Sequence, residues 1–184
     1  MTAEAWSALA SAVGVVVALA ALVVESRRSR FTHSLDTVSR LDERFQSPEF
    51  RNARRRAAAY ILSPDQSDSA GEEAAREVLN YFETIGFLFR KDAIDAETIW
   101  HYFGSWLLPY HAACRKVIDQ EQALDPNCYR DLKPVVDAVF RVEERERNYV
   151  EAAKVTARDS IERFLQREIS LPRKVPAELL PPPT

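Results

Sequence analysis

Few side chains in this sequence have the types and spacings that chemistry needs. The histidines are His33, His101 and His111, and the cysteines are Cys114 and Cys128. His111 and Cys114 are three residues apart, a spacing that places two metal ligands on one helical face. Because Cys114 falls within an apolar stripe and no further ligand clusters nearby, a buried thiol beside a surface histidine is favoured over a metal site.

Signatures of catalysis and nucleotide binding are missing from the sequence. There is no Gly-x-Ser-x-Gly elbow and no Cys–His pair in a recognisable context. Only four glycines occur, which excludes a glycine-rich phosphate loop and a dinucleotide-binding fingerprint. The formal net charge of −3 argues against a nucleic-acid partner. We therefore expect no catalytic residues, no metal and no cofactor, and a protein that is not an enzyme.

Two charged residues stand out because they lie on or beside apolar helix faces. Glu146 occupies the centre of an otherwise apolar stripe, where an unpaired carboxylate would be costly. Arg54 borders the apolar face of an earlier helix. The sequence predicts a buried ion pair between Arg54 and Glu146 or a solvated gap in the bundle, and a functional carboxylate is the alternative.

Arginines cluster at two places in the chain. Arg27, Arg28 and Arg30 follow a long apolar run, and Arg51 and Arg55 lie on a later predicted helix. A basic side chain near an anionic leaflet contributes about 1 kcal/mol of attraction. These arginines are candidates for contact with a membrane surface, and an ordinary solvated helix face is the alternative.

The apolar run Ala5–Val24 holds no charged residue between Glu4 and Glu25. About 20 helical residues at 1.5 Å each span roughly 30 Å, the hydrocarbon thickness of a bilayer. A cleaved signal peptide is disfavoured because the start lacks Lys and Arg, and an interfacial helix because the run has no charged face. The sequence therefore predicts a single transmembrane anchor over residues 1–25.

The charges that flank the anchor predict its orientation. No basic residue precedes it and three arginines follow it, and positively charged flanks remain in the cytoplasm. We expect an inner-membrane protein with its N-terminus outside and its larger domain in the cytoplasm. Ala10, Gly14 and Ala18 recur on one face, a spacing that lets two helices pack closely in lipid. Dimerisation through this face is the alternative to a chance spacing in an alanine-rich segment.

Residues 26–171 are predicted to form an all-α bundle of about five helices, since no alternating strand pattern flanked by turn signals occurs. Residues 172–184 are proline-rich and are predicted to be a disordered tail. The expected helices are a juxtamembrane helix that ends near Ser47, then 48–62, 72–90, one from 95 with a kink or break near Leu107 ahead of Pro109, and 134–169.

The helix expected over 72–90 has an apolar arc around Phe82 that is wide enough to contact more than one neighbour. It should therefore be central, and a close helix crossing would explain Gly86. Phe87 falls on the polar side of this helix, so either another helix covers it or it marks a partner surface. The last helix follows an approximate heptad rhythm that includes Glu146 and Tyr149 among its inner positions.

Three stretches carry a family resemblance: Leu41–Phe45 with Ser47–Arg51, Leu79–Glu83 with Ile85-Gly86, and Tyr102 through Tyr110. They resemble an uncharacterised bacterial family of small α-helical proteins with an N-terminal membrane helix, known only as a domain of unknown function. The similarity covers roughly residues 34–118. It implies a helical fold and brings no catalytic residues to this chain.

Two functions are compatible with these features. The first is a single-pass membrane-anchored module that binds the lipid bilayer and a protein partner, which includes a second copy of itself as a homodimer. The second is a membrane-tethered sensor or effector, for example in stress or phage defence, whose bundle binds a small ligand. The second needs a pocket with convergent polar groups, which we expect near Arg54, His111 and Glu146.

Overall fold

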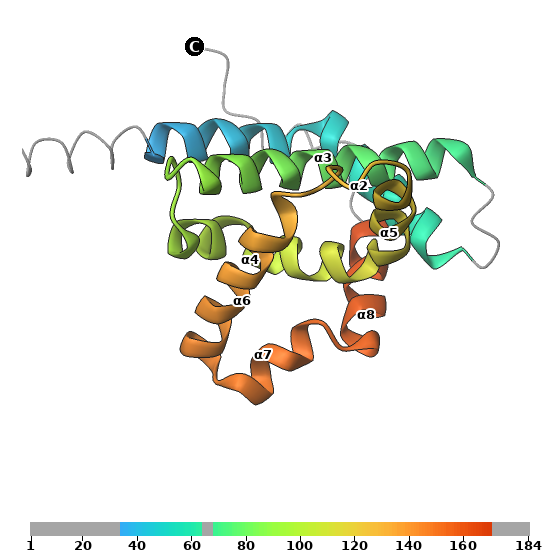
Figure 1. The fold of residues 1–184 in the computed structure, drawn as a ribbon. Helices are drawn as coiled ribbons and strands as arrows, with labels where there is room; N and C mark the ends of the chain where they lie inside the picture. The colour runs from blue at the N-terminus through green and yellow to red at the C-terminus, as the bar shows by residue number, and fades with distance from the viewer. Residues whose placement is uncertain (1–33, 64–67, 171–184) are drawn as a thin grey trace, which may run out of the picture. The chain divides into compact units, whose positions relative to one another are not determined.

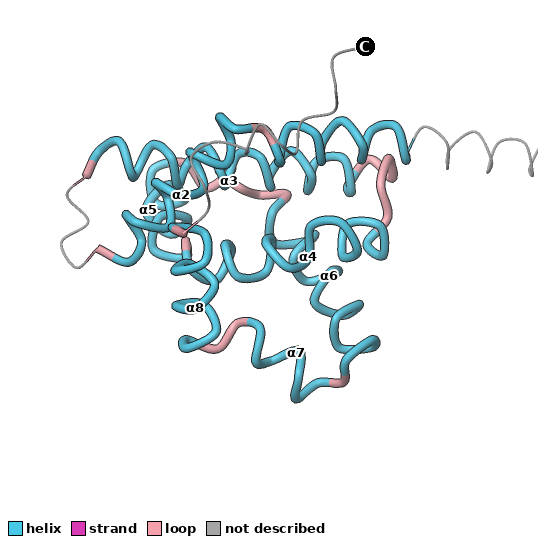
Figure 2. Tube along the Cα trace, turned by 180° about the vertical axis from the view of Figure 1, so that it is seen from behind, coloured by secondary structure: helices cyan, strands magenta, loops and turns pink. Residues whose placement is uncertain are grey.

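The computed structural model describes residues 34–63 and 68–170, and these residues form helices joined by short loops, with no strand among them (Figure 1 and Figure 2). The chain divides into two compact units, Met1–Ser39 and Arg40–Thr184. The first unit contributes only helical residues 34–39 to the described part. The predicted anchor over 1–25 and the predicted tail over 172–184 lie outside the described residues. No helix within 34–63 or 68–170 has the length and apolar character that crossing a bilayer requires.

The prediction of an all-α bundle is confirmed for the described residues, although the helices outnumber the five expected. A helix over residues 34–46 comes first. It is followed by α2 (Pro48–Leu62), α3 (Ser69–Arg90), α4 (Ala96–Ala113), α5 (Arg115–Leu124), α6 (Leu132–Arg147), α7 (Tyr149–Val155) and α8 (Arg158–Ile169).

Side-chain caps begin the first helices of the second unit. Ser47 Oγ accepts a hydrogen bond from the backbone N–H of Phe50 at 3.2 Å, and Pro48 occupies the first helical turn, so the predicted start of α2 is confirmed. Asp68 caps α3 by accepting from the backbone N–H of Ala70 at 3.1 Å. This cap starts α3 three residues earlier than the periodicity predicted.

The helix expected from residue 95 is not broken near Leu107, because α4 continues through Pro109 to Ala113. A proline inside a helix costs about 3 kcal/mol relative to alanine. Leu107, Leu108 and Tyr110 are all buried, as is Pro109 itself. Their packing against the core outweighs the lost backbone hydrogen bond, and the helix ends one turn later instead.

The single long helix expected over 134–169 is also wrong, because this segment forms α6, α7 and α8. Asn148 separates α6 from α7 with a positive φ of 63°, and its side chain accepts from the backbone N–H groups of Val150 and Glu151. The extended backbone of Ala157 separates α7 from α8. These breaks remove the heptad seam, and Glu146 and Tyr149 are exposed rather than inward-facing.

Helix α3 runs along the upper part of the unit in Figure 1 and contacts α2, α4 and α6, so the prediction that it meets more than one neighbour is confirmed. Its apolar arc is buried as far as Gly86, and Leu88 and Phe89 at its end are half-buried. The rings of Phe45, Tyr81 and Phe103 form one aromatic cluster with centroid distances of 5.2 to 6.1 Å. The part of the arc around Phe82 therefore belongs to the domain's own core.

Gly86 of α3 sits where the chain that enters α6 crosses closely. A Cβ atom at this position would lie 2.4 Å from the carbonyl oxygen of Asp131. That oxygen belongs to the backbone and cannot move aside as a flexible side chain would. The close crossing predicted at Gly86 is confirmed.

We predict that Gly86→Ala lowers the free energy of unfolding by about 1–3 kcal/mol, because the new methyl group forces α3 and the start of α6 apart. Urea unfolding followed by circular dichroism measures the loss. Asn80→Ala is the matched control, since Asn80 is an exposed position on α3 and alanine favours a helix. Equal midpoints for Gly86→Ala and the wild type would contradict the close crossing.

Candidate functional site in the cleft between four helices

Helices α4, α6, α7 and α8 line a cleft of about 590 Å³ in the second unit. The four helices surround the lower half of the domain in Figure 1, and α7 joins α6 to α8 along its lower edge. The residues that line it are Trp100, His101, Gly104, Ser105, Pro109, Glu143, Arg147, Glu151, Lys154, Val155, Ser160, Phe164 and Arg167. The cleft therefore has more polar and charged groups than apolar ones on its walls.

Glu143 is the fixed polar group of the cleft wall. It is buried on α6, and the indole N–H of Trp100 on α4 donates a hydrogen bond to its Oε2 atom. Its Oε1 atom lies 3.2 Å from Nε of Arg147, one helical turn along α6. Each carboxylate oxygen thus has one partner, which compensates a buried charge that would otherwise be costly. The arrangement holds the Trp100 ring in place at the cleft.

The remaining charged groups of the cleft lie nearer to solvent. Lys154 and Glu151 on α7 form an ion pair with Nζ and Oε1 at 2.5 Å. Arg167 on α8 is exposed and has no carboxylate partner among the described residues. The cleft walls therefore carry three cations against two carboxylates, with the hydroxyl groups of Ser105 and Ser160 beside them.

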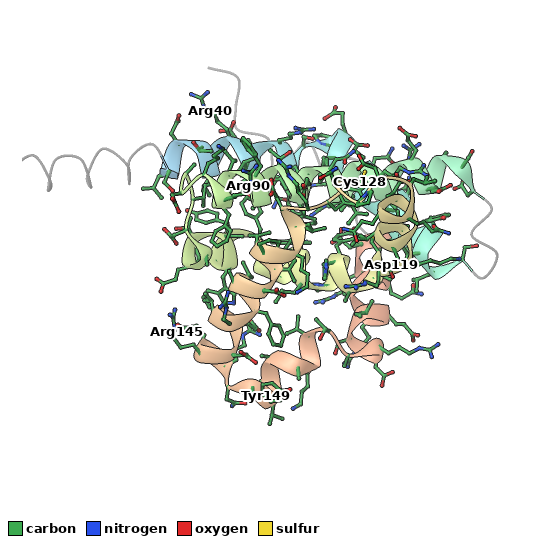
Figure 3. All side chains as sticks on the ribbon, in the orientation of Figure 1. Arg40, Arg90, Asp119, Cys128, Arg145 and Tyr149 are labelled. Carbon is green, nitrogen blue, oxygen red and sulfur yellow. The ribbon has the colours of Figure 1, made fainter. Side chains whose placement is uncertain are left out.

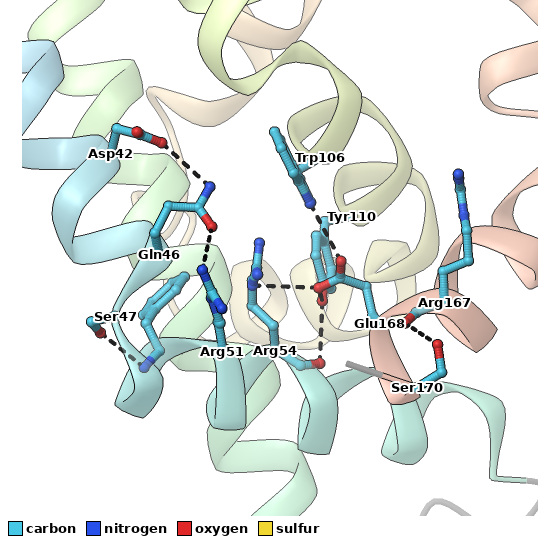
Figure 4. Close-up of polar contacts among 11 residues, drawn as sticks. Asp42, Gln46, Ser47, Arg51, Arg54, Trp106, Tyr110, Arg167, Glu168 and Ser170 are labelled. Atoms are coloured by element: carbon cyan, nitrogen blue, oxygen red, sulfur yellow. Dashed lines mark hydrogen bonds and ion pairs between the residues drawn. The ribbon is translucent and has the colours of Figure 1, made fainter. Parts of the chain in front are cut away.

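A second polar cluster lies in the core, at the opposite side of α8, and centres on Arg54 (Figure 4). Arg54 is 2% exposed, and its Nε atom lies 3.4 Å from Oε2 of Glu168. Glu168 Oε2 also lies 3.0 Å from the Tyr110 hydroxyl, and its Oε1 accepts from the Trp106 indole N–H at 3.3 Å. The Arg54 guanidinium stands 4.1 Å from the centroid of the Phe45 ring.

Burial and the charge of Glu168 act in opposite directions on the pKa of Arg54 and in the same direction on that of Tyr110. Burial lowers the pKa of Arg54, and the negative charge of Glu168 raises it. The pKa of the Tyr110 hydroxyl is raised, first by burial and then by the neighbouring Glu168 charge, so the phenol stays neutral and can donate. Arg54 Nε and Nη1 are buried without a hydrogen-bond partner in the described structure. Attraction to Glu168 and to the Phe45 ring face therefore replaces hydrogen bonding.

The predicted ion pair between Arg54 and Glu146 is wrong, because the partner of Arg54 is Glu168. The Glu146 side chain is 46% exposed and pairs with the adjacent Arg145 at 3.3 Å. Its position was predicted from a continuous last helix, and α6 ends at Arg147. A signal for Glu168 was present: with Phe164 and Leu165 it forms the buried i, i+3, i+4 face of α8.

The other predicted site residues in the described part do not converge. Phe87 is 44% exposed, so the expectation that another helix covers it is wrong. The cations of Arg90 and Lys91 lie 5.2 and 5.9 Å from its ring centroid. Arg51 and Arg55 are half-buried and donate to the side chains of their neighbours on the chain. The membrane-helix residues Ala10, Gly14 and Ala18, and the arginines Arg27, Arg28 and Arg30, lie outside the described residues.

His111 and Cys114 lie apart from the cleft. Cys114 is fully buried, and burial raises the pKa of its thiol to about 12. Burial is also the main cause that lowers the pKa of His111, and the charge of Arg115 lowers it further. Within residues 34–63 and 68–170, no three His, Cys, Asp or Glu side chains come close enough together to hold a metal ion.

We predict that Glu168→Gln lowers the free energy of unfolding by about 3 kcal/mol, because it leaves the Arg54 charge buried without compensation. Glu146→Gln is the matched control and should change it by less than about 0.5 kcal/mol, as is usual at an exposed site. Chemical unfolding of both variants measures the difference. Arg54→Met combined with Glu168→Gln should lose less than the sum of the single losses, and strict additivity would exclude a direct pair.

Comparison with known proteins identifies the family of this chain and no function. No curated protein and no solved structure shows significant similarity to it. A family model described as "Domain of unknown function (DUF4760)" matches residues 8–158, which is most of the chain. The predicted membership of an uncharacterised family is confirmed at this level. The chain belongs to the DUF4760 family.

Proposed function

We propose that this chain is a membrane-anchored sensor whose helical domain binds a small ligand in the cleft between α4, α6, α7 and α8. The observation that supports it is the cleft itself. Its volume of about 590 Å³ is typical of small-molecule sites, and polar groups from four helices converge on it. The bonds from Trp100 and Arg147 to Glu143 organise one wall before any ligand arrives.

Two sequence features that would favour a protein-interaction module, a wide apolar arc and a heptad-like last segment, are largely used within the domain. The apolar arc of α3 around Phe82 is buried against α2, α4 and α6. The heptad-like positions of the last segment are divided among three helices. Because neither feature is available to a partner helix, we favour ligand binding over protein binding as the function of the domain.

One observation still favours a protein partner as the second candidate function. Tyr149 and Val150 at the start of α7 are 68% and 63% exposed. Figure 3 shows Tyr149 at the lower edge of the domain, pointing away from the core. A protein that reads the state of the cleft could dock on this edge, since α7 also contributes Glu151 and Lys154 to the cleft.

A change in the cleft would reach the helix over 34–46 through α8. Arg167 lines the cleft, and the next residue, Glu168, holds Arg54 of α2 in the core. Arg54 in turn stacks on Phe45 of the helix over 34–46. In the sequence, that helix follows the proposed anchor with no proline or glycine between Val15 and Ser47. A ligand that shifts α8 would therefore act on the helix over 34–46, which is the described helix nearest the proposed anchor in the sequence.

To test ligand binding, the full chain in detergent is heated with a deproteinised cell extract freed of macromolecules. We expect the melting temperature to rise by at least about 2 °C, because a ligand that binds only the folded state stabilises it. Ser105→Trp fills the cleft and should abolish the rise. Tyr102→Trp introduces the same residue at an exposed position of α4 outside the cleft and should keep it. A rise of equal size in Ser105→Trp, or none in the wild type, would contradict the proposal.

The membrane part of the proposal rests on the charge-free run Ala5–Val24 and the three arginines that follow it. Reporters fused after Thr184 test it directly. We expect a fusion that is fluorescent only in the cytoplasm to be active, and an alkaline phosphatase fusion, which needs an oxidising compartment, to be inactive. The reverse pattern would overturn the orientation, and recovery of the chain in the soluble fraction would overturn the anchor.

A further inference from the structure

We infer that the ligand of the cleft carries an oxyanion, a carboxylate or a phosphate group, which binds the guanidinium of Arg167. This inference rests on the proposed function, because it names the chemical class of the ligand for the same cleft. The pairing of the charged side chains on the cleft walls supports it.

Four of the five charged groups in the cleft already compensate one another. Glu143 is paired with Arg147, and Glu151 is paired with Lys154. Arg167 is the lining cation without a carboxylate partner among the described residues. The cleft therefore holds one uncompensated positive charge, and a ligand with one negative group would neutralise it.

The chemistry of arginine narrows the class of group further. The planar guanidinium presents its N–H donors as a fork that matches the two oxygens of a carboxylate or a phosphate. Arg147 adds donors from the adjoining wall, since its pairing with Glu143 uses Nε and leaves the terminal nitrogens without a partner in the described structure. Ser105 and Ser160 supply hydroxyl groups for the remaining oxygens.

The uncharged part of the cleft suits the organic body of such a ligand. This part is lined by Trp100, Pro109, Val155 and Phe164. The Phe164 ring packs edge-on against the Tyr110 ring, with the two ring centroids 5.0 Å apart. A planar or apolar group could pack against the Trp100 indole while the oxyanion meets Arg167. The volume of about 590 Å³ limits the ligand to a small molecule.

A cationic ligand fits the same walls poorly. The Glu143 side chain is only 6% exposed and both its oxygens are occupied, so a cation would have to displace Arg147 or the Trp100 indole. Glu151 is nearer to solvent, but its Oε1 atom already lies 2.5 Å from Nζ of Lys154, so a cationic ligand would compete with Lys154 for it. The free charge in the cleft is positive, and this selects an anion.

The test titrates the full chain in detergent with inorganic phosphate and, separately, with acetate, at constant ionic strength set by chloride. The change in tryptophan fluorescence, to which Trp100 in the cleft wall contributes beside Trp6 and Trp106, and the melting temperature report binding. We expect at least one oxyanion to bind saturably and Arg167→Gln to weaken that binding about 10-fold, as loss of a charge-assisted contact implies. Arg163→Gln is the matched control on the same helix, because Arg163 is exposed and does not line the cleft. Arg167→Lys, which keeps the charge without the fork, should fall between them.

The inference is overturned if Arg167→Gln and Arg163→Gln weaken binding equally, since the effect would then be general charge screening. It is also overturned if neither oxyanion binds and the Ser105→Trp-sensitive ligand from the extract is neutral or cationic. In that case the proposed function would stand. Absence of any Ser105→Trp-sensitive ligand would instead remove the proposed function itself. Binding of phosphate without acetate, or of acetate without phosphate, supports the inference and assigns the oxyanion.

Discussion

The second unit is organised around one positive charge that has almost no access to water. Arg54 is 2% exposed, and removing such a charge from solvent costs several kcal/mol. Glu168 and the Phe45 ring face repay part of that cost, so α8, α2 and the end of the helix over 34–46 must meet at one place. Trp106 and Tyr110 complete the surroundings of Glu168 from α4.

This constraint also accounts for the cleft. Glu168 holds α8 against α2 and α4. The start of α6 is held against α3 through Asp131. The Asp131 carboxylate lies 2.8 Å from Nε of Arg90, and its backbone N–H donates to the Glu83 carboxylate at 3.1 Å. The two helices are thus fixed from different sides of the core. The short helix α7 connects their far ends, as Figure 2 shows from behind. The cleft is the space that these separate attachments leave between α6 and α8.

The two polar clusters of the domain differ in what they can do. The buried cluster around Arg54 is closed to solvent, so its charges serve to position helices. The cleft walls combine a buried, compensated carboxylate with cations that reach solvent, which is the arrangement expected of a binding site rather than of a structural pair. Arg167 and Glu168 are consecutive residues that face these two surroundings, and α8 therefore lies between the cleft and the buried cluster.

Local patterns in the sequence were enough to predict α2, α3 and the close crossing at Gly86, because caps, apolar periodicity and a glycine within a helix act through near neighbours. They failed where distant contacts decide. Packing of buried side chains carries α4 through Pro109, and the backbone conformation of Asn148 divides the last segment. The partner of Arg54 and the cleft depend on where α8 folds back, which no local pattern encodes. The chain's local chemistry determined its helices, and tertiary packing decided which charges are buried together and which face the cleft.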